Sequence, residues 1–144
     1  MIEPFSTDVT IQAKPAAVWA ALTQPARMTE WLAEPEAQIQ VITNWQINTP
    51  ITIRGFHHVK FENKGIVLRF DQERKLAYTH LSSVSRLPDM AENYSILEFT
   101  LSAVDQFTHL RLTIENFPTE SIQKHLEFYW RTTLFLIKEQ VEQA

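Results

Sequence analysis

The residues best suited to acid–base chemistry are His80 and Tyr78. A strand over residues 76–80 would place Leu76, Tyr78 and His80 on one face, because alternate side chains of a strand share a face. A neutral imidazole on that face could orient a ligand or act as a general base. It could equally be a polar wall residue with a satisfied hydrogen bond, so we assign no catalytic residue.

The serines that follow His80 are weak candidates for nucleophilic chemistry. Ser82, Ser83, Ser85 and Asp89 lie close after it, but no G-x-S-x-G turn accompanies them. Serine and aspartate are also common in loops. We therefore expect no Ser–His–Asp triad.

Metal and nucleotide chemistry lack the residues that they require. His57 and His58 are adjacent and would point to opposite faces of a strand, no H-E-x-x-H spacing occurs, and the chain has no cysteine. Gly55 and Gly65 are the only glycines, so neither a P-loop nor a G-x-G-x-x-G motif exists. The sequence predicts no metal site and no cofactor.

The charge composition argues against a nucleic-acid partner. Lys and Arg number 13 against 17 Asp and Glu, which gives a formal net charge of −4, and no basic run occurs. The segment Met1–Phe5 lacks the features of a signal peptide, and apolar runs such as Ala16–Leu22 are far shorter than the ~20 residues of a membrane span. We expect a cytoplasmic protein without a membrane span.

Prolines and period-two patterns locate the elements of the first half. Residues 8–13 alternate as a strand, and helices begin at Pro15 and Pro25, the second ending near Leu32. Residues 39–42 and 51–54 alternate again. A stronger strand begins at Gly65, with one face formed by Ile66, Leu68 and Phe70.

The second half predicts a hairpin and a long helix. After a polar loop over residues 82–93, two alternating runs around residues 97–103 and 110–114 form an antiparallel hairpin with one buried face. Thr119 is a suitable N-cap for a helix over residues 120–143. Its broad apolar stripe excludes Phe128 and Phe135.

These elements predict a single α+β domain over residues 1–144. A sheet of about six or seven strands with one solvent-exposed and one apolar face must pack its apolar face against another element. The C-terminal helix is the only large amphipathic element available. We therefore expect a curved antiparallel β-sheet wrapped around a long C-terminal α-helix, with two short helices after the first strand.

Several segments resemble a known family. The segments are V-T-I-x-A-x-P-x-x-V-W-x-A-L-T at residues 9–23, M-x-x-W-L at 28–32, G-x-V-L at 65–68, K-L-A-Y-T-H at 75–80, L-T-I-x-N at 112–116 and the helix around Trp130. They are similar to segments of START-like (SRPBCC, helix-grip) domains. More narrowly, residues 8–142 resemble the activator of heat-shock protein 90 ATPase homologue-like family. The resemblance implies a cavity between helix and sheet. Members bind lipids, sterols or polyketides, a few are cyclases or aromatases, and the eukaryotic activator stimulates a chaperone ATPase. That activator carries a further N-terminal domain, which we do not expect here.

Pattern and resemblance together predict a small non-enzymatic protein that binds a hydrophobic or amphipathic small molecule, lipid-like or polyketide-like, between the sheet and the C-terminal helix. The expected ligand-binding residues are mostly aromatic or aliphatic: Trp45, Phe56, Leu68, Tyr78, His80, Phe99, Ile114, Trp130 and Leu134. The same aromatic side chains could instead fill the core at normal packing density.

Other functions stay open at this point. The chain could bind a chaperone through its outer surface, or it could be a cyclase or hydrolase that uses His80 and Tyr78. A homodimer through Phe128 and Phe135 is a further hypothesis, because side chains outside the apolar stripe need another burial partner, such as the first strand, the short helices or a second subunit.

Overall fold

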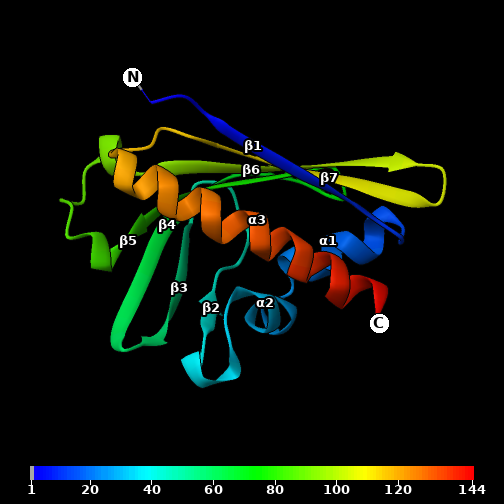
Figure 1. Ribbon diagram of the computed structural model, residues 1–144, viewed down its shortest axis with the longest axis horizontal. Coiled ribbons are helices and arrows are strands. Elements are labelled where there is room, and N and C mark those ends of the chain that lie inside the picture. Colours follow the sequence, from blue (N-terminus) through cyan, green and yellow to red (C-terminus); the bar gives the residue numbers. More distant parts are fainter. Residues whose placement is uncertain (1) are drawn as a thin grey trace.

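The computed structural model describes residues 2–144, and these contain seven strands and three α-helices (Figure 1). The strands are β1 (Phe5–Ile11), β2 (Gln40–Ile42), β3 (Pro50–His57), β4 (Val59–Asp71), β5 (Lys75–Ser82), β6 (Ser95–Val104) and β7 (Phe107–Glu115). The helices are α1 (Pro15–Thr23), α2 (Pro25–Leu32) and α3 (Glu120–Glu142), and the short 3-10 helices are η1 (Pro35–Ala37), η2 (Ser83–Ser85) and η3 (Ala91–Asn93).

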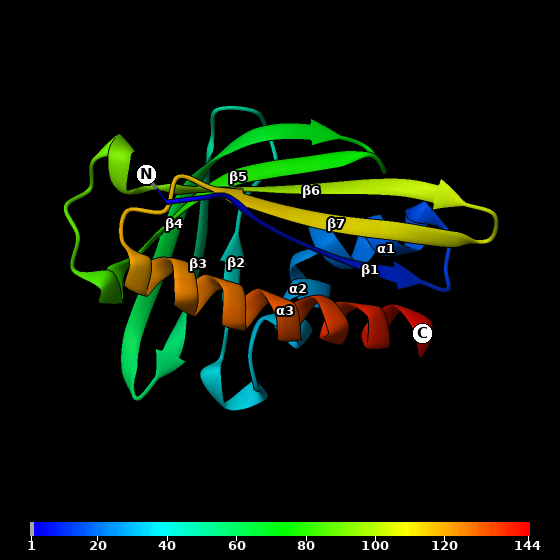
Figure 2. The same ribbon diagram turned by 45° about the horizontal axis from the view of Figure 1, so that its top comes forward.

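The seven strands form one antiparallel sheet in the order β1-β7-β6-β5-β4-β3-β2. Figures 1 and 2 show β2, β3 and β4 turned away from β1, β7 and β6, so that the sheet curves around α3. Helix α3 crosses the concave face and packs against β1, α1 and α2. The predicted α+β architecture, a curved sheet around a long C-terminal helix, is confirmed. Across residues 2–144, no helix combines the length and the hydropathy needed to span a bilayer.

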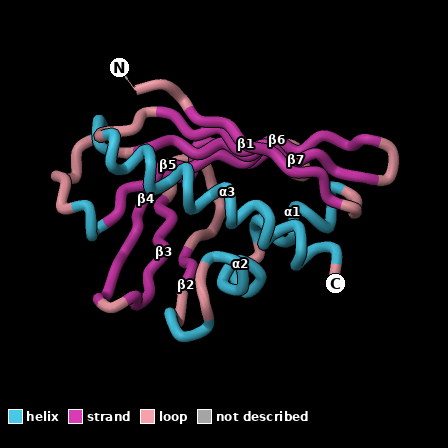
Figure 3. Tube along the Cα trace, viewed as in Figure 1, coloured by secondary structure: helices cyan, strands magenta, loops and turns pink. Residues whose placement is uncertain are grey.

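Figure 3 shows the three helices, and each begins where the sequence predicts. Pro15 and Pro25 are the first residues of α1 and α2, where the missing proline N–H costs no hydrogen bond. The Thr119 hydroxyl caps α3 by accepting a hydrogen bond from the Ile122 N–H at 3.1 Å. The first strand spans Phe5–Ile11 rather than residues 8–13, since it pairs with β7 along its whole length.

The hairpin of β6 and β7 supplies the centre of the core. Its inward residues alternate as predicted, and α3 covers them with Leu134 and Ile137, which are almost fully buried. The buried hairpin residues are Leu97, Phe99, Leu101, Leu110, Leu112 and Ile114.

Strand β4 differs from the prediction at its start. It begins at Val59 rather than at Gly65, and its first half pairs with β3 as a long hairpin. These residues are mostly exposed and polar, so they lack the apolar alternation by which a half-buried strand is recognised.

The inward face of β4 also differs, because a β-bulge interrupts the strand. Val67 is fully buried, whereas Ile66 and Leu68 are 38% and 40% exposed. The register to β5 shifts between Val67 and Arg69, which makes Leu68 the extra residue. A bulge inverts the alternation of a strand. The prediction that Ile66 and Leu68 share the buried face is therefore wrong.

Gly65 lies where β4 and β5 come close together. A Cβ atom at this position would lie only 1.7 Å from the backbone carbonyl oxygen of Thr79. No side chain can be accommodated there without moving one of the two strands.

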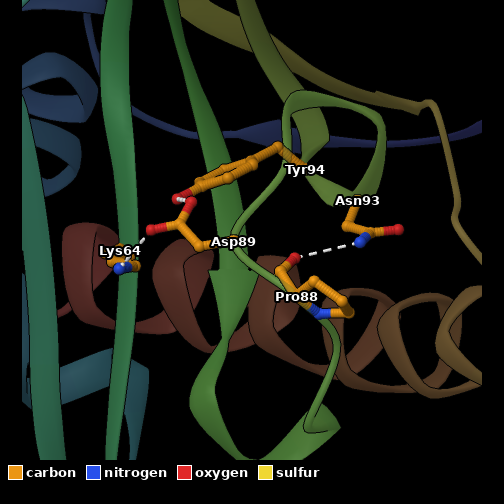
Figure 4. A network of polar contacts seen from close by, with 5 residues as sticks. All are labelled: Lys64, Pro88, Asp89, Asn93 and Tyr94. Atoms are coloured by element: carbon orange, nitrogen blue, oxygen red, sulfur yellow. Dashed lines mark hydrogen bonds and ion pairs between the residues drawn. The ribbon is translucent and has the colours of Figure 1, made fainter.

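The polar segment after β5 is fastened to β4 by side chains (Figure 4). The Lys64 ammonium contacts the Asp89 carboxylate at 2.5 Å, and the Tyr94 hydroxyl donates to the same carboxylate at 2.5 Å. The Asn93 amide donates to the Pro88 carbonyl oxygen at 2.9 Å. The hydrogen bond and charge of Lys64 lower the pKa of Asp89.

Candidate functional site

The layer between the concave face of the sheet and α3 contains six of the nine predicted ligand-binding residues. Tyr78, Phe99, Ile114, Trp130 and Leu134 are all at least 96% buried there. His80 is half-buried and shares the inward face of β5 with Tyr78.

An aromatic chain runs through this layer. Phe99 stands between Tyr78 and Trp130, with ring centroids 6.2 and 5.5 Å away. Tyr78 continues to Trp45 at 6.2 Å, and Trp45 stacks on Phe70 at 5.7 Å. These separations lie within the range of favourable aromatic pairs. Trp45, a seventh predicted residue, therefore joins the layer from the loop after β2.

The polar groups of these aromatic residues differ in whether they form a hydrogen bond with the protein. The Trp45 indole donates to the Thr23 carbonyl oxygen at 2.6 Å, and the Tyr129 hydroxyl donates to the Leu32 carbonyl oxygen at 2.6 Å. Within residues 2–144 the Tyr78 hydroxyl makes no such bond. Burial raises the pKa of Tyr78, and it raises the pKa of Tyr129 to about 12, so both phenols are neutral at physiological pH.

His80 is a neutral imidazole in this environment. Burial lowers the pKa of His80 to about 4, and His125 on α3 lowers it further. A neutral imidazole offers one donor and one acceptor nitrogen. His80 can therefore exchange hydrogen bonds with a bound molecule, and it carries no charge with which to attract one.

Ser95 stands next to His80, because the two residues pair across β5 and β6. The buried serine and threonine side chains in residues 2–144 are those of Thr23, Ser95, Thr108 and Thr133. Each threonine hydroxyl donates to a backbone carbonyl oxygen at 2.7 Å. The Ser95 hydroxyl is buried without a hydrogen-bond partner.

Asn63 provides a third polar group on the concave face. It pairs with the buried Ile53 on one side and with Ser82 on the other, so it shares their inward face. Its Oδ1 atom is also buried without a hydrogen-bond partner. The three neighbouring strands β4, β5 and β6 thus each contribute one polar side chain to the same region: Asn63, His80 and Ser95.

Sequence reasoning missed Asn63 and Ser95. Ser95 has a readable signal, since it continues the inward alternation of Leu97, Phe99 and Leu101 and is the one polar residue in that series. Asn63 has none, because it lies in the polar half of β4 that was not predicted as a strand.

The structure places the remaining predicted residues, Phe56 and Leu68, outside this layer. Phe56 is 50% exposed and points away from the inward series Ile51, Ile53 and Gly55 of β3. Leu68 is the bulge residue described above. Within residues 2–144 the Phe56 ring pairs with none of the rings of the aromatic chain.

The other reactive side chains do not come together. Asp89 is engaged by Lys64 and Tyr94 (Figure 4), and the Ser85 hydroxyl donates to the Ser82 backbone rather than to an imidazole. His57 and His58 are exposed at the β3–β4 turn. Among residues 2–144, no three His, Asp or Glu side chains gather as metal ligands would.

Two open hollows lie on the surface, away from the layer. One lies on α3 beside Phe128 and Arg131, and the other surrounds Gly55 near the β3 edge and includes Phe56. Phe56 alone of the nine predicted residues lines either of them.

Comparison with known proteins identifies a family. The model of the family described as "Activator of Hsp90 ATPase homolog 1-like protein" matches residues 12–142. No curated protein gives a significant match. Among solved structures, ChR145 from Cytophaga hutchinsonii is 30% identical, with 99% of this chain and 95% of that chain covered and a TM-score of 0.81.

Two more distant structures share the fold. CV1439 from Chromobacterium violaceum is 18% identical over 99% of both chains, with a TM-score of 0.83. The protein described as the Aha1 dimer from Colwellia psychrerythraea is 17% identical over 98% of this chain and 97% of that one, with a TM-score of 0.77.

Proposed function

The chain belongs to the family of activator of Hsp90 ATPase homolog 1-like proteins, and we propose that this member is a cytoplasmic binding protein for an apolar or amphipathic small molecule. The ligand, lipid-like or polyketide-like, binds between the sheet and α3. The observation that carries the proposal is the concave wall itself: an aromatic chain adjoins polar atoms of Asn63 and Ser95 that have no protein partner.

Natural cores rarely leave buried polar atoms without partners, because each such atom loses its hydrogen bonds to water. A cluster of these atoms beside apolar rings suits a ligand with an apolar body and a polar end. The body would lie against Tyr78, Phe99 and Trp130, where dispersion and ring stacking stabilise it.

Entry of the ligand requires the side chains of the layer to yield, since Phe99 and Trp130 already pack at 5.5 Å. The entrance would lie beside His125, which is exposed on α3 and near the half-buried His80. Binding should therefore perturb the N-terminal half of α3 and the end of β5 together.

A paired set of variants tests the location of the ligand. Leu134→Trp enlarges a side chain that is 2% exposed in the layer, whereas Leu136→Trp makes the same change at a position that is 42% exposed. Isotope-labelled protein would be titrated with a fatty acid, a sterol and a flavonoid while amide chemical shifts are followed. We expect saturable shifts in residues 76–81 and 126–137 with one ligand class, lost in Leu134→Trp and retained in Leu136→Trp.

The same titration can reject the proposal. If no ligand class shifts these residues, or if both variants bind as the wild type does, the layer is a filled core and not a binding site. A Leu134→Trp protein that fails to fold would show this in its amide spectrum. Leu134→Phe, a smaller increase in volume, would then replace it.

The alternative function is interaction with a chaperone, which the family description favours. It predicts line broadening of exposed amides on addition of purified Hsp90 and a change in the ATPase rate of the chaperone. Leu134→Trp should leave that interaction intact, whereas substitutions of exposed charges should weaken it.

We also propose self-association through the outer face of α3. Phe128 is 78% exposed and Phe135 is 53% exposed, one heptad apart on the same helix. Large exposed aromatic side chains on a helix commonly mark an interaction surface. The similar Colwellia structure is described as a dimer, which supports a second copy as the partner.

A further inference from the structure

We propose that Asn63, His80 and Ser95 form a polar anchor that recognises a neutral hydroxyl group, as in a phenol or an alcohol, and that discriminates against carboxylates. The inference rests on the proposed function and adds the chemical class of the ligand. It follows from three features: an unpartnered serine, the placement of the three residues on adjacent strands, and the absence of a buried counter-charge.

The Ser95 hydroxyl is the strongest indication that these three residues bind a ligand. Ser95 is 1% exposed and its hydroxyl has no partner, whereas the hydroxyls of the three buried threonines are all satisfied. Leaving a hydroxyl unpaired destabilises a fold, and alanine would fit the same strand position without that cost. A bound hydroxyl group would supply the missing partner.

The register of the sheet brings the three residues together. Ser95 pairs directly with His80, and Asn63 pairs with Ser82, which is the next inward residue of β5 after His80. Side chains on directly opposed or diagonal positions of adjacent strands lie within about 4.5–8 Å of one another. His80 is therefore the central residue, with Ser95 directly opposite it on β6 and Asn63 diagonal to it on β4.

The hydrogen-bonding capacities of the anchor match a hydroxyl. The free Asn63 atom is a carbonyl-type oxygen, which can only accept, while the Ser95 hydroxyl can donate or accept. Neutral His80 offers both a donor and an acceptor. A ligand hydroxyl beside His80 can donate to Asn63 and accept from His80, or it can exchange hydrogen bonds with Ser95 and His80.

A carboxylate would fit this anchor poorly. It has no proton to give to the Asn63 oxygen, and it would bring a negative charge into a region without a buried cation, since residues 2–144 bury no charged side chain. Lys64, the residue after Asn63, is engaged with Asp89. Transferring an uncompensated charge from water into such a site is strongly unfavourable.

The aromatic chain sets the shape of the rest of the ligand. The residue of β5 that lies next to His80 on the same inward face is Tyr78, whose ring faces Phe99 and Trp45. A planar ring system attached to the hydroxyl would lie against these side chains. Hydroxylated aromatic compounds are therefore the expected class of ligand.

The test uses three naphthalenes that differ only in one substituent: naphthol, methoxynaphthalene and naphthoate. Affinities would be measured by tryptophan fluorescence and amide shifts near neutral pH for the wild type, for Ser95→Ala, and for Ser102→Ala, a matched change at an exposed position of the same strand. In the wild type we expect naphthol to bind about tenfold more tightly than either analogue.

Ser95→Ala should weaken naphthol binding about three- to tenfold, leave methoxynaphthalene binding unchanged, and raise the melting temperature of the ligand-free protein. Ser102→Ala should change none of these. If Ser95→Ala does not fold, Asn63→Leu on β4 replaces it, with the same expected loss for naphthol alone.

The outcomes separate this inference from the proposed function. Equal binding of the three compounds, or tighter binding of naphthoate, overturns the anchor and leaves a ligand-binding layer in place. A loss of stability in Ser95→Ala with unchanged discrimination shows that Ser95 is structural and also overturns the anchor. If none of the three compounds binds, both the anchor and the proposed function are rejected.

Discussion

Acidification should destabilise this protein through a single imidazole, that of His80. In the folded protein its pKa is lowered to about 4, mainly by burial, whereas in the unfolded chain it has its ordinary value of 6.5. Between these two values the unfolded chain binds a proton that the native protein does not. Stability is therefore fully present above pH 6.5 and is lost as the pH falls toward 4.

The magnitude follows from the two pKa values. Integrating the difference in proton binding from about pH 7 to about pH 5 gives a loss of about 2 kcal/mol in the free energy of unfolding. The ring is half-buried, so solvent reduces the penalty and this figure is an upper bound. With a urea m-value of about 2 kcal/mol/M, the midpoint should fall by as much as about 1 M.

The assay is urea unfolding at the two pH values for the wild type, His80→Gln and His109→Gln. His109 is a matched control because it is partly exposed on β7 and lies 3.4 Å from the Asp8 carboxylate, away from the layer. The wild type and His80→Gln have the same carboxyl groups, so the difference in slope between these two proteins isolates His80, and His109→Gln shows the effect of replacing a histidine outside the layer. Equal pH dependence in the wild type and His80→Gln would refute the assignment of a neutral, buried His80.

The remaining predictions concern the fold and its surface. Gly65→Ala should cost about 3 kcal/mol or more in urea unfolding, because its Cβ atom would lie 1.7 Å from the Thr79 carbonyl oxygen; an unchanged midpoint would contradict this packing. Thr119→Ala should cost about 1 kcal/mol in the same assay by removing the cap from the Ile122 N–H, and Thr119→Ser should restore most of it. Phe135→Asp places a charge on the exposed face of α3, so the protein should stay folded and its sedimentation should shift toward the monomer. A folded variant that sediments as the wild type does removes the dimer hypothesis.

The parts of the fold that could be predicted are those governed by local chemistry. Pro15 and Pro25 start their helices because proline has no N–H to lose, and Thr119 caps α3 because its hydroxyl reaches a free amide. The β6–β7 hairpin was predictable because one face is dry and the other wet, which enforces strict alternation.

The parts that could not be predicted depend on distant contacts. The bulge at Leu68 changes which residues of β4 point toward the core, and the local alternation of apolar residues does not indicate an extra residue. Phe56 lies outward because the inward positions of β3 are fixed by pairing with β4. The anchor residues are a similar case, since Asn63 becomes inward only through its pairing with Ile53 and Ser82.

The pairing of β1 with β7 has a consequence for how the protein is made. Within residues 2–144, β1 has a single strand partner, β7, which lies far along the sequence, with Phe5 opposite Ile114. A further link joins the Gln12 amide to the Glu142 carboxylate, 130 residues apart in sequence. Closing loops of this length is slow, and β1 cannot pair before β7 has been synthesised. Until β7 is available, β1 remains an unpaired edge strand, and its pairing is therefore a late step of folding.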